Sequence, residues 1–168
     1  MPSMDSTKPK WQLPQTPIIL ATESMARRRM FENAGILHNA IAANLDEDAL
    51  RAAAAHENIS PADTASMLAE AKAMKISAQH PSALIIASDQ LLVCKGVIYG
   101  KPATLAEAKT RLNALAGKTH ELVTAGVIIL ANQRLWHLVK SPKITLRELS
   151  DHDIDSYLAA MADEAMLT

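Results

Sequence analysis

The stretch LIIASDQLLV at residues 84–93 decides the fold. It is a continuous apolar run with β-branched residues, which is typical of a strand buried on both faces of a sheet. Three polar residues, Ser88, Asp89 and Gln90, stand in its middle. An unpaired carboxylate at a buried position costs on the order of several kcal/mol. Asp89 is therefore expected either to pair with a cation or to cap a loop where the strand leaves the sheet.

A tight turn follows this strand. Lys95 and Gly96 separate it from the short apolar run Val97–Tyr99, and this spacing is typical of a β-hairpin. Lys101 comes shortly after that run, and an antiparallel return of the chain can bring it back near Asp89. The sequence alone leaves this pairing open, because a carboxylate with unusual surroundings marks an active site only some of the time.

The rest of the chain alternates short apolar strands with helices that have clear start signals. Ser24, Ser60, Thr104 and Ser150 each stand where an N-cap is needed, and Gly35 stands where a helix ends. The predicted helices cover residues 25–35, 45–56, 61–79, 105–116 and 151–161, and the predicted strands cover residues 17–21, 38–44, 84–93, 97–99, 119–130, 134–140 and 142–147. Because two of the strand connections are hairpins, this order predicts an α/β domain with a mixed sheet.

Composition limits the class of protein. The 168 residues suffice for one domain that buries about 70% of the surface of its unfolded chain. A net charge of −1 and 3% aromatic residues argue against a nucleic-acid partner. No apolar run approaches the roughly 20 residues of a membrane span, and the N-terminus lacks a secretory signal. We therefore expect no membrane partner, a cytoplasmic location, and a flexible polar tail at residues 1–15 before a domain at residues 16–168.

Two charged clusters near helix starts allow two interpretations each. Arg27–Arg29 follow Ser24 in the first turn of a helix, where they either help to bind an anion or simply face solvent. The helical period directs Arg27 and Arg29 to different sides, so at most one of them is expected to reach the turn. Asp46–Asp48 either complement the dipole of the next helix or supply oxygen ligands for magnesium or manganese.

One lysine falls in the apolar stripe of a helix. Leu68, Lys72 and Ile76 form a row with a spacing of four residues, which puts Lys72 in line with side chains expected in the core. Such a lysine usually extends its ammonium group to solvent along the apolar surface. The alternative is that the helix delivers Lys72 into a cleft.

Motifs spread over residues 17–168 give the chain a family resemblance. They are Leu20–Arg27 (LATESMAR), Ala34–Ile36 (AGI), Asp46-Glu47, Ala71–Ala73 (AKA), Ser88–Gln90 (SDQ), Gly100–Pro102 (GKP) and Leu115–His120 (LAGKTH). In this order and spacing the chain resembles the Maf-like nucleoside triphosphate pyrophosphatases. The resemblance implies a Maf-like two-lobed α/β fold, with a mixed, curved β-sheet flanked by helices and a central cleft. It also implies metal-assisted hydrolysis of a nucleoside triphosphate to the monophosphate and pyrophosphate.

The resemblance also assigns roles to individual residues. Asp89 corresponds to the catalytic acid that accepts a proton, and Asp89 and Glu47 correspond to the residues that hold a divalent metal, Mg or Mn. The implied substrate-binding residues are Thr22, Ser24, Arg27, Lys72, Gln90 and Lys101. The Ser-Asp-Gln motif resembles the branch that acts on 7-methyl-GTP and related nucleotides, although UTP or dTTP stays open as the substrate. The implied partner is a nucleoside triphosphate, and the resemblance is compatible with a homodimer.

The chain departs from the family pattern near its end. It stops at Thr168, where the family continues into a glycine-rich segment that adds a strand and part of the nucleotide pocket. We therefore expect a C-terminally truncated domain. Two hypotheses follow: an active pyrophosphatase, or a catalytically impaired nucleotide-binding or regulatory protein on the same scaffold. A third, a nucleic-acid binder that uses Arg27–Arg29, is disfavoured by the charge and the few aromatic residues.

Overall fold

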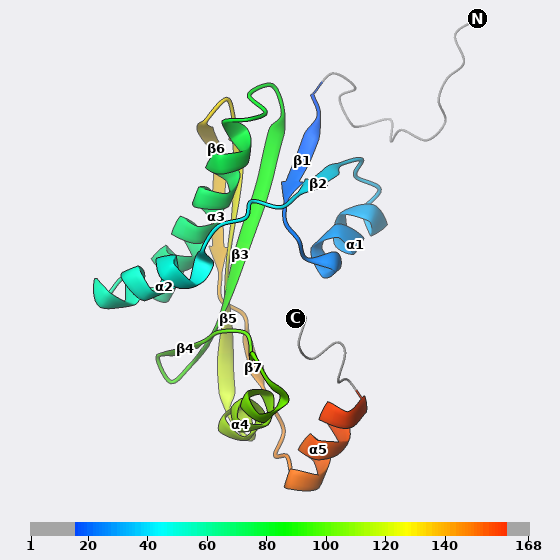
Figure 1. Cartoon of the computed structure of the whole chain (residues 1–168), viewed down its shortest axis with the longest axis vertical. Coiled ribbons are helices and arrows are strands. Elements are labelled where there is room, and N and C mark those ends of the chain that lie inside the picture. Colours follow the sequence, from blue (N-terminus) through cyan, green and yellow to red (C-terminus); the bar gives the residue numbers. More distant parts are fainter. Residues whose placement is uncertain (1–15, 161–168) are drawn as a thin grey trace, which may run out of the picture. The chain divides into compact units, whose positions relative to one another are not determined.

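The computed structural model describes residues 16–160, which form seven strands and five helices (Figure 1). The strands are β1 (Ile18–Ala21), β2 (Asn39–Ile41), β3 (Leu84–Cys94), β4 (Val97–Tyr99), β5 (Thr119–Leu130), β6 (Gln133–Lys140) and β7 (Lys143–Thr145). The helices are α1 (Met25–Asn33), α2 (Glu47–His56), α3 (Pro61–Ser77), α4 (Leu105–Leu115) and α5 (Asp151–Ala160). The α/β fold expected from the sequence is confirmed. The predicted tail at 1–15, and residues 161–168 of the predicted domain, lie outside the described residues.

The predicted start signals cap four of these helices. The hydroxyl groups of Ser24, Ser60, Thr104 and Ser150 each accept a hydrogen bond from the backbone N–H three residues later. Each bond satisfies a donor that the helix itself leaves unpaired, and such a cap typically contributes about 1 kcal/mol. Within the described part of the chain, no helix combines the length and apolar character needed to cross a membrane.

The sheet is mixed, as the two hairpins predicted. Its main path runs β2-β1-β3-β5-β6, with β4 paired to β3 and β7 paired to β5. Strand β1 is parallel to both β2 and β3, with Ile19 opposite Asn39 on one side and Ile85 on the other. The β3–β4 and β5–β7 pairs are antiparallel. The Lys95-Gly96 turn between β3 and β4 has positive φ at both residues, which suits a tight hairpin.

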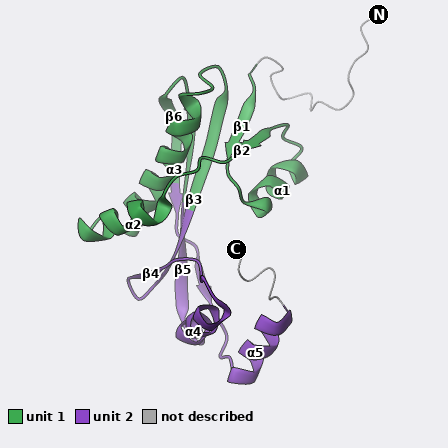
Figure 2. Ribbon diagram, viewed as in Figure 1, with its two compact units in different colours: residues 1–89, 125–138 green, residues 90–124, 139–168 purple. Residues whose placement is uncertain are grey.

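The chain divides into two compact units (Figure 2). Among the described residues, unit 1 consists of 16–89 and 125–138, and unit 2 consists of 90–124 and 139–160. Strands β3 and β5 each pass from one unit into the other. This division agrees with the two-lobed fold that the resemblance implies. The central cleft stays a prediction.

Helix α3 forms the core of unit 1 together with the sheet. Its row Leu68, Lys72 and Ile76 is buried, as the four-residue spacing predicts. On β3, burial alternates: Ile85, Ala87 and Asp89 are buried, whereas Ile86 and Ser88 between them are half-buried. The expectation that this strand is buried on both faces was therefore wrong. An apolar run in the sequence does not reveal whether helices cover one face of the sheet or both, and here α3 lies against one face of β3.

Unit 2 has a smaller core between its two helices. Ala108 of α4 packs with Ile154 and Leu158 of α5, and Leu112 and Leu149 complete this cluster. A salt bridge of 2.5 Å between Lys109 and Asp155 lies at the surface of the same helix pair.

Candidate active site

Lys72 lies at the centre of a charged cluster in unit 1. Its Nζ is 2.6 Å from Asp89 Oδ1 and 2.8 Å from Glu47 Oε1, so one ammonium group is shared by two carboxylates. Only 9% of the Lys72 side chain is exposed. The usual explanation, in which the lysine reaches solvent, is therefore wrong here: helix α3 delivers the charge to β3 and to the start of α2. Removing such a charge from water is tolerated only when its hydrogen bonds are satisfied.

Asp89 is placed by the alternation of β3. It shares the buried face of the strand with Ile85 and Ala87, and this face lies against α3. Its Oδ1 accepts the bond from Lys72, whereas Oδ2 is buried and has no hydrogen-bond partner among residues 16–160. A buried carboxylate oxygen without a partner is costly, so it indicates a position reserved for a proton, a water molecule or a cation.

Glu47 is the first residue of α2 and divides its two oxygens between two cations. Oε1 binds Lys72, and Oε2 lies 3.4 Å from Nη1 of Arg51 one turn later in the helix. Burial pushes the pKa of Glu47 upward, but the hydrogen bond and charge of Lys72, followed by those of Arg51, outweigh it and hold the pKa below its ordinary value. Glu47 is therefore a carboxylate near neutral pH, as a metal ligand must be.

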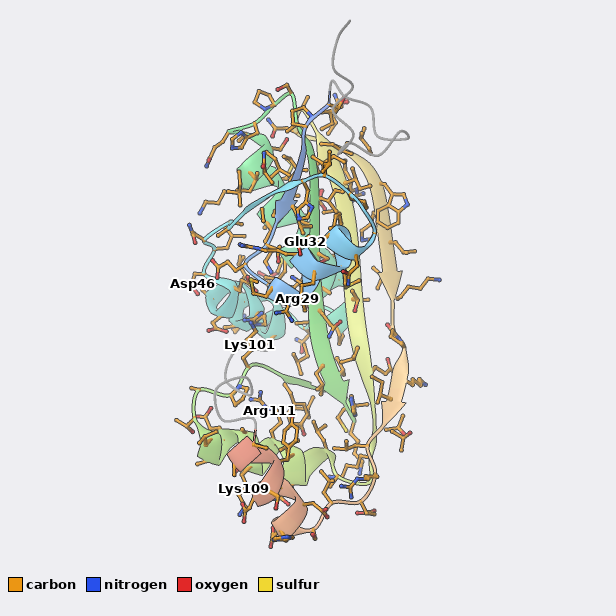
Figure 3. The ribbon with its side chains drawn as sticks, turned by 90° about the vertical axis from the view of Figure 1, so that its right-hand side faces the viewer. Arg29, Glu32, Asp46, Lys101, Lys109 and Arg111 are labelled. Atoms are coloured by element: carbon orange, nitrogen blue, oxygen red, sulfur yellow. The ribbon has the colours of Figure 1, made fainter. Side chains whose placement is uncertain are left out.

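Two contacts hold the start of α2 in this position. Asp46, labelled at the beginning of α2 in Figure 3, caps the helix, since its Oδ1 accepts a bond of 2.9 Å from the N–H of Ala49. Lys75 of α3 donates to the carbonyl of Asn44 at 2.7 Å, which ties the segment before α2 to α3. The two interpretations of the acidic cluster at residues 46–48 are therefore compatible. Asp46 caps the helix, and Glu47 forms an ion pair with Lys72.

The turn between β1 and α1 carries the two predicted hydroxyl groups. Thr22 Oγ1 accepts from the N–H of Ser24 at 3.1 Å, and Ser24 Oγ accepts from the N–H of Arg27 at 3.4 Å. Because both oxygens act as acceptors in these bonds, both O–H groups stay able to donate to an anion. The arginine that reaches back to the turn is Arg28, whose Nη2 donates to the carbonyl of Thr22 at 3.3 Å. Arg29, labelled on α1 in Figure 3, is exposed.

Two predicted site residues belong to unit 2. Gln90 is exposed, and its Oε1 accepts a bond of 3.1 Å from the hydroxyl of Thr124, which orients its amide group. Lys101 is exposed on the loop between β4 and α4 (Figure 3). Arg111 of α4 donates to the carbonyl of Gly100, and this bond holds the same loop. The grouping of Lys101 with Asp89 stays a prediction, and the cation that the structure places on Asp89 is Lys72.

Sequence reasoning missed two arginines. Arg51 contacts Glu47, and the signal that could have found it is the spacing of four residues between an acid and a base on one helix. Arg28 belongs to a basic run of three arginines in the sequence. No sequence signal distinguishes Arg28 from its two neighbours. Which of the three arginines reaches the turn depends on the orientation of α1 relative to the turn before it.

The carboxylates of the charged cluster fit a divalent metal. Asp89 Oδ2 is buried and has no partner within the part of the chain that the structure describes, and Glu47 and Asp89 already converge on one cation, the ammonium of Lys72. Carboxylate oxygens are the ligands that magnesium and manganese prefer. Among residues 16–160 no group of three or more His, Cys, Asp or Glu side chains is arranged around a common point. The residues therefore fit an ion that takes most of its ligands from water and phosphate, as magnesium commonly does.

The fold and the charged cluster define a mixed α/β protein with a buried lysine held between two carboxylates. The family model described as Maf-like protein matches residues 17–166, so the chain belongs to the Maf-like family. It is 43% identical over 150 residues to a nucleoside triphosphate pyrophosphatase of Paramagnetospirillum magneticum, which covers 89% of this chain and 77% of that relative. A 7-methyl-GTP pyrophosphatase of Rhizobium meliloti is 38% identical over 149 residues, with 89% and 75% covered. A solved nucleoside-triphosphatase (dITP/XTP pyrophosphatase) from Mycobacterium abscessus aligns at 13% identity and a TM-score of 0.40 over 88% of this chain and 94% of that one, too weak a likeness to bear on the assignment.

Proposed function

We propose that this chain hydrolyses a nucleoside triphosphate to the nucleoside monophosphate and pyrophosphate. The observation that carries the proposal is Asp89, which is buried, held at one oxygen by Lys72, and unpartnered at the other among residues 16–160. An oxygen that is fixed in place and still free to accept is suited to take a proton from water or to bind a cation. Membership of the Maf-like family, and relatives named as pyrophosphatases of nucleoside triphosphates, support the same activity.

The reaction breaks the anhydride bond between the α- and β-phosphates, and the oxygen of water forms the new bond to phosphorus. Negative charge accumulates on the leaving pyrophosphate, so positive charge fixed near the phosphates lowers the barrier. Lys72, whose ammonium lies beside Asp89, is proposed to supply one such charge. The hydroxyl groups of Thr22 and Ser24 are proposed as donors to phosphate oxygens, with Arg27, Gln90 and Lys101 as further substrate ligands.

We also propose magnesium or manganese as the cofactor, with Glu47 and Asp89 as its protein ligands. When bound, such an ion neutralises charge on phosphate oxygens and lowers the pKa of a coordinated water. The chain's own residues would orient the ligands: Lys72 fixes one oxygen of Asp89 and one of Glu47, which leaves Asp89 Oδ2 available. Among nucleotides, 7-methyl-GTP is the proposed substrate, with UTP and dTTP as alternatives. The homodimer stays a prediction.

The test is to identify the products formed from a panel of nucleoside triphosphates, including 7-methyl-GTP, UTP and dTTP, with magnesium or manganese. We expect pyrophosphate and the monophosphate, rather than phosphate and the diphosphate, from at least one nucleotide. Asp89→Asn should remove this activity. Asp63→Asn is the matched control, because Asp63 lies in the same unit but is exposed, and within residues 16–160 its side chain bonds only to Ser60.

Three results would contradict the proposal. Wild-type chain that releases no pyrophosphate from any nucleotide would exclude catalysis, and nucleotide binding without release would favour the impaired binding protein instead. Release of phosphate in place of pyrophosphate would show that the chain cleaves a different bond from the one proposed. Equal activity in the wild type and in Asp89→Asn would remove Asp89 from the chemistry.

A further inference from the structure

We propose that Arg51 is a positioning residue for the hydrolysis, in that it fixes the Glu47 carboxylate, which in turn fixes the Lys72 ammonium against Asp89. This inference rests on the proposed function, since it assigns a role within the same site. Arg51 stands at one end of a chain of four residues in which cations and anions alternate: Arg51, Glu47, Lys72 and Asp89.

The guanidinium of Arg51 binds two carboxylates of its own helix. Nη1 is 3.4 Å from Glu47 Oε2, and Nη2 is 2.8 Å from Asp48 Oδ1. The planar, rigid fork of arginine makes both contacts at once, so the short bond to Asp48 sets the plane in which Nη1 meets Glu47. A lysine at this position could make either contact but could not hold the two in a fixed relation.

An ion pair between residues four apart on a helix is often only a weak surface contact. Two observations separate this one from that class. The Arg51 side chain is only 26% exposed, and that of Glu47 is 35% exposed. The other oxygen of Glu47 binds a lysine with a side-chain exposure of 9%.

The geometric consequence concerns the orientation of Glu47. With each oxygen engaged by a different cation, the carboxylate has one defined rotation, and Oε1 is presented to Lys72. Without Arg51, the Glu47 side chain can turn, and both of its oxygens compete for Lys72. Lys72 is then held less firmly at 2.6 Å from Asp89. Oδ2 of Asp89, which has no partner among the described residues, loses its fixed position. Residues that orient the groups bound to a reacting centre typically change its activity when they are removed.

The experiment compares Arg51→Met, Arg51→Lys, Asp48→Asn and Arg134→Met in the full chain. Arg134 is the matched control, because it is an arginine of the same unit that pairs with a glutamate, Glu70, at 3.0 Å on an exposed surface. The measurements are kcat for pyrophosphate release, the dissociation constant of a nucleotide analogue with a non-hydrolysable α,β-bridge, and the thermal unfolding temperature.

We expect Arg51→Met to lower kcat by about 10- to 100-fold, as is common for residues that orient a reactive centre, while the affinity for the analogue stays unchanged. Arg51→Lys should recover part of the loss. Asp48→Asn should have a small effect, because asparagine keeps the Oδ1 atom that accepts from Nη2 of Arg51, and the charge that is removed is 94% exposed and largely screened. A merely structural role would instead lower the unfolding temperature and leave the kcat of the folded enzyme intact.

The inference is overturned if the kcat of Arg51→Met equals that of Arg134→Met, or if the affinity for the analogue falls while kcat is unchanged. In either case, pyrophosphate release by the wild type, together with its loss in Asp89→Asn, leaves the proposed function standing. Wild-type chain that releases no pyrophosphate overturns the proposed function and the role of Arg51 with it.

Discussion

Replacing Lys72 by methionine tests the physical basis of the site, because methionine keeps most of the length and removes the charge. The two carboxylates that share the ammonium lose it together. Glu47 keeps Arg51 and a side chain that is 35% exposed, so it can be stabilised by that arginine and by water. Asp89 is only 3% exposed, and its other oxygen has no partner within residues 16–160. The cost of the substitution therefore falls mainly on Asp89.

The expected magnitudes differ between the two partners. Removing one member of a buried ion pair usually costs about 3–5 kcal/mol, since the remaining charge is left uncompensated, and Lys72→Met should fall in this range. Asp89→Asn should cost less, about 1.5–3 kcal/mol, because Lys72 keeps its bond of 2.8 Å to Glu47. The double variant Lys72→Met/Asp89→Asn should be more stable than Lys72→Met alone, because it no longer buries an unpaired carboxylate.

The free energy of unfolding of these three variants and of the wild type can be measured by urea denaturation. Circular dichroism and tryptophan fluorescence are suitable probes, since Trp136 of β6 belongs to the same unit as the pair. The reasoning is refuted if Lys72→Met costs less than Asp89→Asn. It is also refuted if the double variant loses as much stability as the two single variants combined, because the two charges would then not interact.

Two further predictions concern unit 2. Gly117→Ala should destabilise the protein by about 1–2 kcal/mol in thermal unfolding, because the φ of +66° at Gly117 is strained for alanine and the added Cβ would displace the Glu148 carboxylate. Gly100→Ala is the control and should change the stability little, because a Cβ at Gly100 meets nothing within 4 Å among the described residues. The backbone and side-chain hydrogen bonds of Ser150 lower the pKa of Asp153 from 3.8 to about 2, so its contribution to stability is present above the ordinary value and is lost as the pH falls through about 2. The unfolding temperature of Asp153→Asn should therefore fall less than that of the wild type as the pH is lowered from 3.8 to about 2. If the unfolding temperatures of the two proteins fall in parallel, Asp153 does not have the lowered pKa.

Much of the fold could be predicted because its signals are local. Caps such as Ser60, the positive φ at Gly35 and the Lys95-Gly96 turn act within a few residues, and each lies where the sequence placed it. The extent of strand 38–44 was overestimated, since only Asn39–Ile41 pairs with β1. Pairing depends on the partner strand, and weak alternation in one segment does not reveal it.

The site was predictable in its members and less so in its contacts. Asp89 was recognisable as a carboxylate in an apolar strand, and Lys72 as a charge in an apolar helical row, because both break a periodic pattern. Their bond joins residues 17 apart, through the packing of α3 on β3, and no local pattern specifies that packing. The hairpin suggested Lys101 as the partner because a turn is visible in the sequence, whereas a contact between a helix and a sheet is not.

The central claim is that Asp89 takes part in the chemistry and does not merely hold the fold or the nucleotide. The most direct measurement compares kcat for pyrophosphate release in the wild type and in Asp89→Asn, together with the affinity of each for a non-hydrolysable nucleoside triphosphate analogue. We predict that kcat falls by about 10²–10⁴-fold, the usual contribution of a general base, while both folded proteins bind the analogue. An Asp89→Asn protein that binds the analogue and releases pyrophosphate at the wild-type rate would contradict the claim.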